Sequence, residues 1–105
     1  MNRGDIYELK LTAGTSGHEQ SGKRYAIVVQ ATELAPLSTV IVAPTSTRAA
    51  PASFRPEVQV RRRRTMVLCD QLRALDSRRL RERVGRLTPA DMEEIDRALR
   101  LMLCL

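Results

Sequence analysis

A chain of 105 residues, with 43% hydrophobic and 3% aromatic residues, is long enough for one domain (1–105) with one modest core and too short for two. Its 18 Lys and Arg outnumber 12 Asp and Glu, and the net charge of +6 favours a polyanionic partner, nucleic acid first; an acidic protein partner, or an effect of genome base composition alone, are the alternatives. The scarcity of aromatic residues argues against single-strand binding by stacking of bases on aromatic side chains.

Two strands and the loop between them open the chain. Residues 6–11 alternate apolar and polar side chains, which predicts a half-buried strand. The run at 26–29 is wholly apolar and predicts a buried strand over 25–30. Residues 12–23 between them form a long polar loop, and the end of such a loop on a rigid strand is where binding groups are often held.

The middle of the chain predicts short strands separated by proline-containing or charged segments. In order these are a connector at 31–37, a β-branched central strand at 38–43 that Pro44 ends, a hydroxyl-rich exit at 45–48, a loop at 49–56, a strand at 57–60, an exposed turn of four arginines at 61–64, a strand at 66–72, a short turn at 75–81 and a strand at 83–87.

The C-terminal segment predicts a helix. Thr88 supplies an N-cap hydroxyl, Pro89 suits the first helical position, and Asp91 places an acid in the first turn. We expect one apolar face to pack on the sheet or on a partner. That face recurs at helical spacing through Met92, Ile95, Leu99, Met102 and Leu103.

Six short strands closed by one helix predict a mainly β fold, a small twisted barrel of antiparallel strands. The chain has no helices between strands that could make the right-handed crossovers of a parallel sheet. It also lacks a Gly-x-Gly-x-x-Gly or phosphate-loop motif, so we expect no nucleotide cofactor.

Targeting, cysteine and metal signals are weak. The first residues form no apolar signal segment and no apolar run approaches a membrane span, so we expect a cytoplasmic protein with no membrane partner. Cys69 and Cys104 lack Cys-x-x-Cys spacing, and we expect both to be small buried hydrophobic residues. With one histidine and two scattered cysteines, we expect no metal site.

Polar residues flank three of the predicted strands, at 19–24, at 45–47 and at 70–71. If the second and third strands are neighbours, Arg24 and the hydroxyls border one cleft. An arginine beside a hydroxyl suits a phosphate: Arg24 would neutralise charge that develops at phosphorus, and Ser46 would donate to a non-bridging oxygen. RNA carries its own nucleophile, the 2′-hydroxyl, so cleavage needs only a proton acceptor, charge stabilisation and a proton donor.

His18 or Glu19 could accept that proton. Each residue also has a plainer interpretation when it is taken alone. Glu19 could pair with Lys23 or Arg24, His18 could be an exposed loop residue, and the hydroxyls at 45–47 could satisfy loop backbone.

Taken together, the motifs carry a resemblance over nearly the whole chain. They are Arg-Gly-Asp-Ile-Tyr at 3–7, Gly-His-Glu-Gln-Ser-Gly-Lys-Arg at 17–24, Val-Ile-Val-Ala-Pro at 40–44 leading into Thr-Ser-Thr, Asp-Gln-Leu-Arg at 70–73, Arg-Leu at 79–80, Val-Gly-Arg-Leu at 84–87, and Met92, Ile95 and Asp96 on the helix. In this order and spacing they resemble the MazF/PemK-type toxins of bacterial type II toxin–antitoxin modules.

The resemblance implies a Src-homology-3-like barrel of 5–7 short antiparallel strands with a C-terminal helix, acting as a homodimer. It further implies a metal-independent, sequence-specific endoribonuclease (an mRNA interferase) that leaves a 2′,3′-cyclic phosphate and a 5′-hydroxyl on single-stranded RNA. An acidic MazE-like antitoxin would block the cleft, in a complex expected to bind DNA.

Carried over to this chain, the catalytic positions are Arg24 and Ser46. The family usually has proline where this chain has Tyr25, and threonine where it has Ser46, so Thr45 or Thr47 could instead supply the hydroxyl. The loop positions that cover the site are Glu19, Gln20 and Gly22. The residues expected at the substrate are His18, Glu19, Gln20, Lys23, Thr45, Thr47, Thr65, Asp70 and Gln71.

Two other functions remain open. One is a non-catalytic binder like the CcdB-type toxins, which resemble this barrel and inhibit DNA gyrase through the terminal helix; the other is an inactive RNA-binding relative. An arginine near a hydroxyl separates the nuclease from the gyrase binder, which does not require them. The four arginines at 61–64 either grip RNA phosphates or the antitoxin, or form a solvated turn.

Overall fold

The computed structural model describes residues 1–10 and 24–105, so His18, Glu19, Gln20, Gly22 and Lys23 lie outside the described residues. The described part contains seven strands, three short 3₁₀ turns and one α-helix. In chain order they are β1 (Asp5–Leu9), β2 (Arg24–Val28), η2 (Thr32–Leu34), β3 (Thr39–Ser46), β4 (Glu57–Val60), β5 (Arg63–Val67), η3 (Cys69–Gln71), β6 (Arg73–Asp76), η4 (Ser77–Arg79), β7 (Leu80–Arg86) and α1 (Pro89–Leu103).

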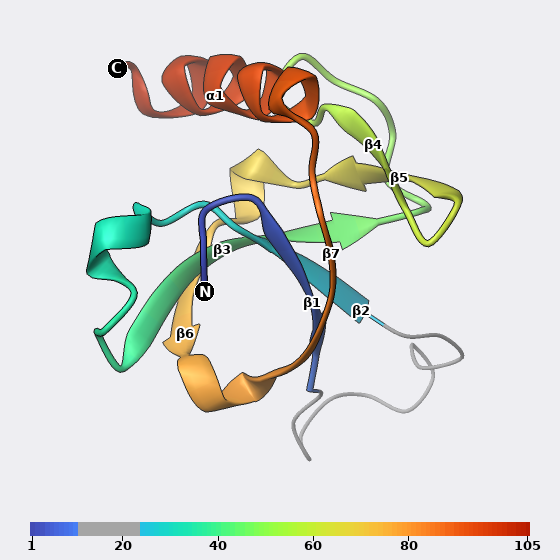
Figure 1. The fold of residues 1–105 in the computed structure, drawn as a ribbon. Coiled ribbons are helices and arrows are strands. Elements are labelled where there is room, and N and C mark those ends of the chain that lie inside the picture. The colour runs from blue at the N-terminus through green and yellow to red at the C-terminus, as the bar shows by residue number, and fades with distance from the viewer. Residues whose placement is uncertain (11–23) are drawn as a thin grey trace.

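All the strands pair antiparallel in one curled sheet. The strand order is β4-β5-β3-β2-β1-β7, and β6 pairs with the first half of β3. Figure 1 shows the sheet bending round on itself into a half-barrel, with α1 lying across one end of it. The predicted mainly β fold with a C-terminal helix is therefore confirmed.

Strand β2 is buried on both faces of the sheet, as its apolar run predicts. Ile27 packs in a cluster with Ile95 and Leu99 of α1. Its neighbours Ala26 and Val28 face the other way, into a second cluster that includes residues of β3, β6 and β7. Because side chains alternate along a strand, a wholly apolar β2 supplies both clusters at once.

The sequence predicted that Pro44 ends the central strand, and this prediction is wrong. Strand β3 runs through it to Ser46. On one edge of β3, β6 pairs with residues 39–42 and β5 pairs with residues 45 and 46, so Pro44 lies between the two ladders. A proline is tolerated there because no ladder on that edge needs its missing N–H.

The strand predicted at 66–72 is wrong in its second half. Strand β5 ends at Val67, and Asp70 lies in the 3₁₀ turn η3 instead of at a strand end. The strand β6, only four residues long, was not predicted; it takes the first two residues of the segment expected as a turn at 75–81, and η4 and the start of β7 take the rest.

The turn between β4 and β5 is formed by Arg61 and Arg62, while the other two arginines of the run already belong to β5. Both turn residues have positive φ, 51° and 68°. Two-residue hairpins with positive φ at both positions normally carry Asn-Gly or Gly-Gly, since side chains with a Cβ are disfavoured there. The predicted exposure of the four arginines is confirmed, but the turn is limited to Arg61 and Arg62, and its composition is unusual.

Helix α1 begins as predicted. The Thr88 hydroxyl accepts a hydrogen bond from the Asp91 backbone N–H at 3.1 Å. The helix buries Ile95, but its last turn faces solvent: Leu101 is 59% and Leu103 50% exposed. No helix in the described ranges is long and apolar enough to cross a membrane. Cys69 is buried as expected, whereas the prediction for Cys104 is wrong, since it is exposed at the C-cap.

Candidate functional site

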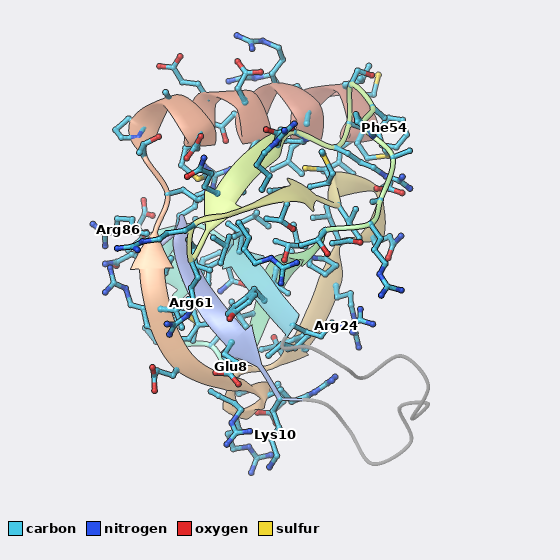
Figure 2. All side chains as sticks on the ribbon, turned by 90° about the vertical axis from the view of Figure 1, so that its right-hand side faces the viewer. Glu8, Lys10, Arg24, Phe54, Arg61 and Arg86 are labelled. Atoms are coloured by element: carbon cyan, nitrogen blue, oxygen red, sulfur yellow. The ribbon has the colours of Figure 1, made fainter. Side chains whose placement is uncertain are left out.

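The proposed catalytic pair lies at one end of two neighbouring strands. β2 begins at Arg24, β3 ends at Ser46, and the two strands run antiparallel. Their last paired residues are Ala26 and Pro44, so Arg24 and Ser46 each lie two residues beyond the same pair. Figure 2 shows Arg24 at the outer end of β2, and its side chain is exposed. The adjacency expected of the second and third strands is confirmed.

The hydroxyls at 45–47 differ in what they contact. Thr45 is 7% exposed, and its Oγ1 donates to the Tyr25 carbonyl oxygen at 3.3 Å. Thr47 is exposed beyond the strand end. The half-buried Ser46 Oγ accepts from two backbone N–H groups, those of Arg48 at 3.1 Å and Ala49 at 3.2 Å.

These two hydrogen bonds determine whether the Ser46 hydroxyl acts as a donor or as an acceptor. A serine hydroxyl has two acceptor lone pairs and one proton to donate. The two backbone N–H groups occupy the acceptor side, so the proton is directed to a further acceptor. Ser46 is thus arranged as a donor, the role that a non-bridging phosphate oxygen requires.

Asp70 is engaged by a residue that the sequence analysis did not single out. Arg55 donates from Nε to Oδ1 at 3.1 Å and from Nη2 to Oδ2 at 2.9 Å. The hydrogen bond from Arg55 lowers the pKa of the Asp70 carboxyl below its usual value. Nothing in the local sequence marks Arg55, which lies in the loop after β3 and meets Asp70 only in the folded chain.

The two remaining predicted substrate residues in the described part lie in contrasting environments. Thr65 is 4% exposed in the middle of β5, opposite Val58 on β4. Its Oγ1 is buried and has no hydrogen-bond partner among the described residues. Gln71 is exposed at the end of η3. The fold therefore presents Gln71 to solvent and encloses Thr65.

Within the two described ranges, no group of three or more His, Cys, Asp or Glu side chains is arranged to hold a metal ion. The polar groups at this end of the sheet are the Arg24 guanidinium and the hydroxyls of 45–47. The chain between β5 and β6, with Asp70 and Gln71, lies beside the middle of β3, since β5 pairs with residues 45 and 46 and β6 with residues 39–42.

Comparisons with known proteins agree on a family. The model of the family described as PemK-like, MazF-like toxin of type II toxin–antitoxin system matches residues 2–103. A protein of Mycobacterium tuberculosis that is named as a toxin is 45% identical over 73 residues, which covers 70% of this chain and 68% of the relative.

Solved structures share the fold at low identity. An endoribonuclease from a mycobacterial species superimposes with a TM-score of 0.80 at 20% identity, covering 100% of this chain and 92% of the other. An endoribonuclease in complex with its cognate antitoxin, also mycobacterial, gives 0.80 at 19% identity, covering 100% and 96%. MazF from Deinococcus radiodurans gives 0.78 at 24% identity, covering 100% and 97%.

Proposed function

This chain belongs to the PemK-like, MazF-like toxin family of type II toxin–antitoxin systems, and from that premise we propose that it is an endoribonuclease that cleaves single-stranded RNA at specific short sequences without a metal ion. The single observation that carries the proposal is the position of Arg24 and Ser46, two residues beyond the same strand pair. The names of structural neighbours, two of which are endoribonucleases, support the same activity.

The chemistry follows from the two side chains. The 2′-oxygen of RNA attacks the adjacent phosphorus, the bond from phosphorus to the 5′-oxygen breaks, and the leaving oxygen takes a proton. The products are a 2′,3′-cyclic phosphate and a 5′-hydroxyl. Arg24 stabilises the negative charge that grows on the phosphoryl oxygens, and Ser46 donates a hydrogen bond to one of these oxygens.

Arg24 is not the general base in this scheme, because a guanidinium group has donors and no acceptor. Arg24 is instead suited to stabilising charge and to donating a proton to the leaving 5′-oxygen. The base stays unassigned. His18 and Glu19, the residues that the sequence suggested for it, lie outside the described residues.

For substrate recognition we propose direct RNA contacts at Thr47 and Gln71, whose side chains are exposed. Thr45 and Thr65 are buried and Asp70 is ion-paired with Arg55, so we propose no direct RNA contact for these three. His18, Glu19, Gln20 and Lys23 remain sequence-based predictions for the same role.

We further propose a homodimer that an acidic antitoxin inhibits, acting in the cytoplasm where RNA is available. The apolar end of α1, with Leu101 and Leu103 half exposed or more, supports a protein contact there. One structural neighbour is described as a complex with its cognate antitoxin. A DNA-binding role for the toxin–antitoxin complex stays a prediction from the resemblance.

The test is cleavage of a long single-stranded RNA by the purified protein in EDTA, with Arg24→Ala and Ser46→Ala beside it. Arg48→Ala is the matched control, because Arg48 is an exposed arginine close to Ser46 in the chain. We expect discrete fragments ending in cyclic phosphate from wild type and Arg48→Ala, and none from Arg24→Ala. If folded wild type leaves varied RNA sequences intact, the nuclease proposal is wrong, and inhibition of gyrase becomes the next activity to assay.

A further inference from the structure

Two arginines on β7 share one side of the sheet because of a β-bulge. Arg83 and Arg86 are three residues apart, and in a regular strand that spacing places side chains on opposite faces. Here the pairing with β1 shifts register: Ile6 lies opposite Gly85 and Tyr7 opposite Arg83, which leaves Val84 as the extra residue. A bulge of this kind redirects a side chain.

Both arginines converge on a single buried carboxylate. The Oδ1 atom of Asp5 lies 3.1 Å from Arg83 Nε and 3.2 Å from Arg86 Nε. The Asp5 side chain is 3% exposed, and its Oδ2 accepts from the Asn2 backbone N–H at 2.8 Å. Burial alone would raise the pKa of Asp5, but the Asn2 hydrogen bond and the two arginines outweigh burial and lower it.

The contact to Asp5 leaves most of each guanidinium available. Both arginines approach Oδ1 through Nε, and their side chains are 48% and 52% exposed. Within residues 1–10 and 24–105, the Nη groups of Arg83 and Arg86 donate no hydrogen bond. One carboxylate therefore orients two cations and neutralises one of them. An arginine whose side chain is already oriented loses less rotamer entropy when it binds an anion.

The β4–β5 hairpin adds to this positive surface. Arg61 Nη2 lies 3.8 Å from Glu82 Oε2, which places the hairpin tip beside β7. Figure 2 shows Arg61 and Arg86 on the β7 side of the molecule and Arg24 toward the opposite edge, where β2 begins. The surface is therefore separate from the proposed catalytic end of β2 and β3.

Arg86 also lines an open pocket of about 380 Å³ between the N-terminus, the end of β7 and the start of α1. Asn2, Arg3 and Thr32 contribute polar groups, while Leu87, Pro89 and Met92 contribute apolar surface. A cation beside a half-apolar pocket suits a nucleotide, because the phosphate can bind the cation while the base packs on the apolar surface. A carboxylate side chain of an acidic peptide would use the cation and leave the apolar wall unfilled.

We propose that Arg83 and Arg86, oriented by Asp5, bind the phosphodiester backbone of single-stranded RNA at a second site outside the cleavage site, with a neighbouring base in the pocket beside Arg86. We call these two arginines with Asp5 the β7 arginine clamp. The proposal rests on the proposed function, since it assigns a further contact for the same substrate. It places RNA on the β7 face as well as at the ends of β2 and β3.

The first experiment measures binding separately from cleavage. Affinity for a labelled 2′-O-methyl oligouridylate, which lacks the attacking hydroxyl, is measured against salt concentration by fluorescence anisotropy. The test variant is Arg83→Gln/Arg86→Gln. The matched control is Arg78→Gln/Arg97→Gln, which removes two other exposed, ion-paired arginines and the same charge.

We expect the clamp variant to bind about 10-fold more weakly than the control, because each phosphate contact to a single strand contributes both Coulomb energy and counterion release. Its slope of log affinity against log salt should flatten by about 1 relative to the control. Equal affinities and slopes for the two double variants would overturn the proposal.

The variant Asp5→Asn distinguishes the effect of arginine orientation on RNA affinity from the effect of net charge. It raises the net charge by one, so long-range electrostatics alone would strengthen RNA binding. The clamp requires the opposite, weaker binding, because Arg83 and Arg86 lose the carboxylate that orients them. Circular dichroism establishes that the variant is folded at the assay temperature. Where it does not fold, the double arginine variant decides the question.

Two further outcomes keep this inference distinct from the nuclease proposal. If wild type cleaves no RNA but the clamp variant still binds the oligouridylate more weakly than its control, the clamp stands and the proposed activity fails. Binding of labelled polyglutamate, a stand-in for an acidic protein, is measured in the same way. If wild type cleaves RNA while the clamp variant loses affinity for polyglutamate and not for the oligouridylate, the surface binds an acidic protein, and the proposal of an RNA site is overturned.

Discussion

Arg55 and Asp70 form a bidentate ion pair, in which Nε donates to Oδ1 at 3.1 Å and Nη2 donates to Oδ2 at 2.9 Å. The pair connects the loop that follows β3 to the 3₁₀ turn η3. That loop starts directly after Ser46, and Arg55 lies near its far end, just before β4. Asp70, which was expected at the substrate, thus holds the loop that follows the proposed catalytic hydroxyl.

We expect this relationship to be visible in the pH dependence of stability. The pKa values of Asp70 and Asp5 are lowered in the folded state, so the folded chain holds fewer protons than the unfolded chain in acid. Their contribution is present above the ordinary value of 3.8 and is lost as pH falls through the lowered values. Thermal unfolding measured from neutral to acidic pH should show that Tm decreases once the pH is below about 4.

Asp70→Asn should lower Tm at neutral pH and reduce the loss of Tm in acid, because the missing carboxylate no longer titrates. Glu33→Gln, which removes an exposed carboxylate on η2, is the control and should leave both quantities near wild type. An acid-induced loss of Tm that is the same in Asp70→Asn as in wild type would count against the ion pair.

Ser46→Thr should retain RNA cleavage, since the hydroxyl that accepts from Arg48 and Ala49 is preserved. Ser46→Ala should lose about 100-fold or more in kcat, as expected when one donor to a developing oxyanion is removed. Thr47→Ala should keep kcat and raise KM. Single-turnover cleavage separates the two effects, and a full loss of kcat in Thr47→Ala would move the catalytic hydroxyl to that position.

Replacing the strained hairpin turn by Arg61→Asn/Arg62→Gly should stabilise the protein by about 1 kcal/mol, because Asn-Gly suits two positive φ angles. RNA affinity should fall at the same time, as two cations beside β7 are removed. Arg61→Lys/Arg62→Lys keeps the charge and the strain, and should leave both properties close to wild type. Urea unfolding and oligouridylate binding measure the two effects; a less stable Asn-Gly variant would refute the turn argument.

The middle of α1 and its C-terminal end should respond differently to truncation of an apolar side chain. Ile95 is fully buried between the helix and the sheet, so Ile95→Ala should cost about 3 kcal/mol. Leu101 is 59% exposed, so Leu101→Ala should change the stability of one protomer by less than about 0.5 kcal/mol. Gel filtration across protein concentrations would reveal whether Leu101→Ala weakens the proposed homodimer; unchanged association would remove this residue from the interface.

Periodicity predicted the elements whose side chains alternate or repeat over several residues. The buried β2, strand β4 and the capped α1 were all evident because local pattern and tertiary burial agree in them. β6 was missed because four residues, Arg-Ala-Leu-Asp, offer too short a pattern. Pro44 misled because its effect depends on which edge of β3 carries a partner at that position, and the sequence does not encode this locally.

The candidate site was only partly predictable for a related reason. Arg24 lies at the start of a strand that the sequence pattern located, and Ser46 lies just beyond the predicted end of the next strand, so the expected adjacency of β2 and β3 was enough to bring the two positions to one end of the sheet. Arg55 meets Asp70 across a loop, and Arg83 meets Asp5 across a bulge. Such contacts depend on backbone irregularities between residues far apart in the chain, which one sequence does not reveal.

The pairing of β1 with β7 links the first and last parts of the chain, since Asp5 and Arg86 bond across 81 positions. Ile6 and Ile95 likewise share one core cluster. A nascent chain leaving the ribosome therefore carries Arg24 and Ser46 long before the strand and helix that complete their scaffold exist. Contacts so distant form only after β7 and α1 have been synthesised, so we expect the proposed nuclease to fold around Arg24 and Ser46 well after these two residues have left the ribosome.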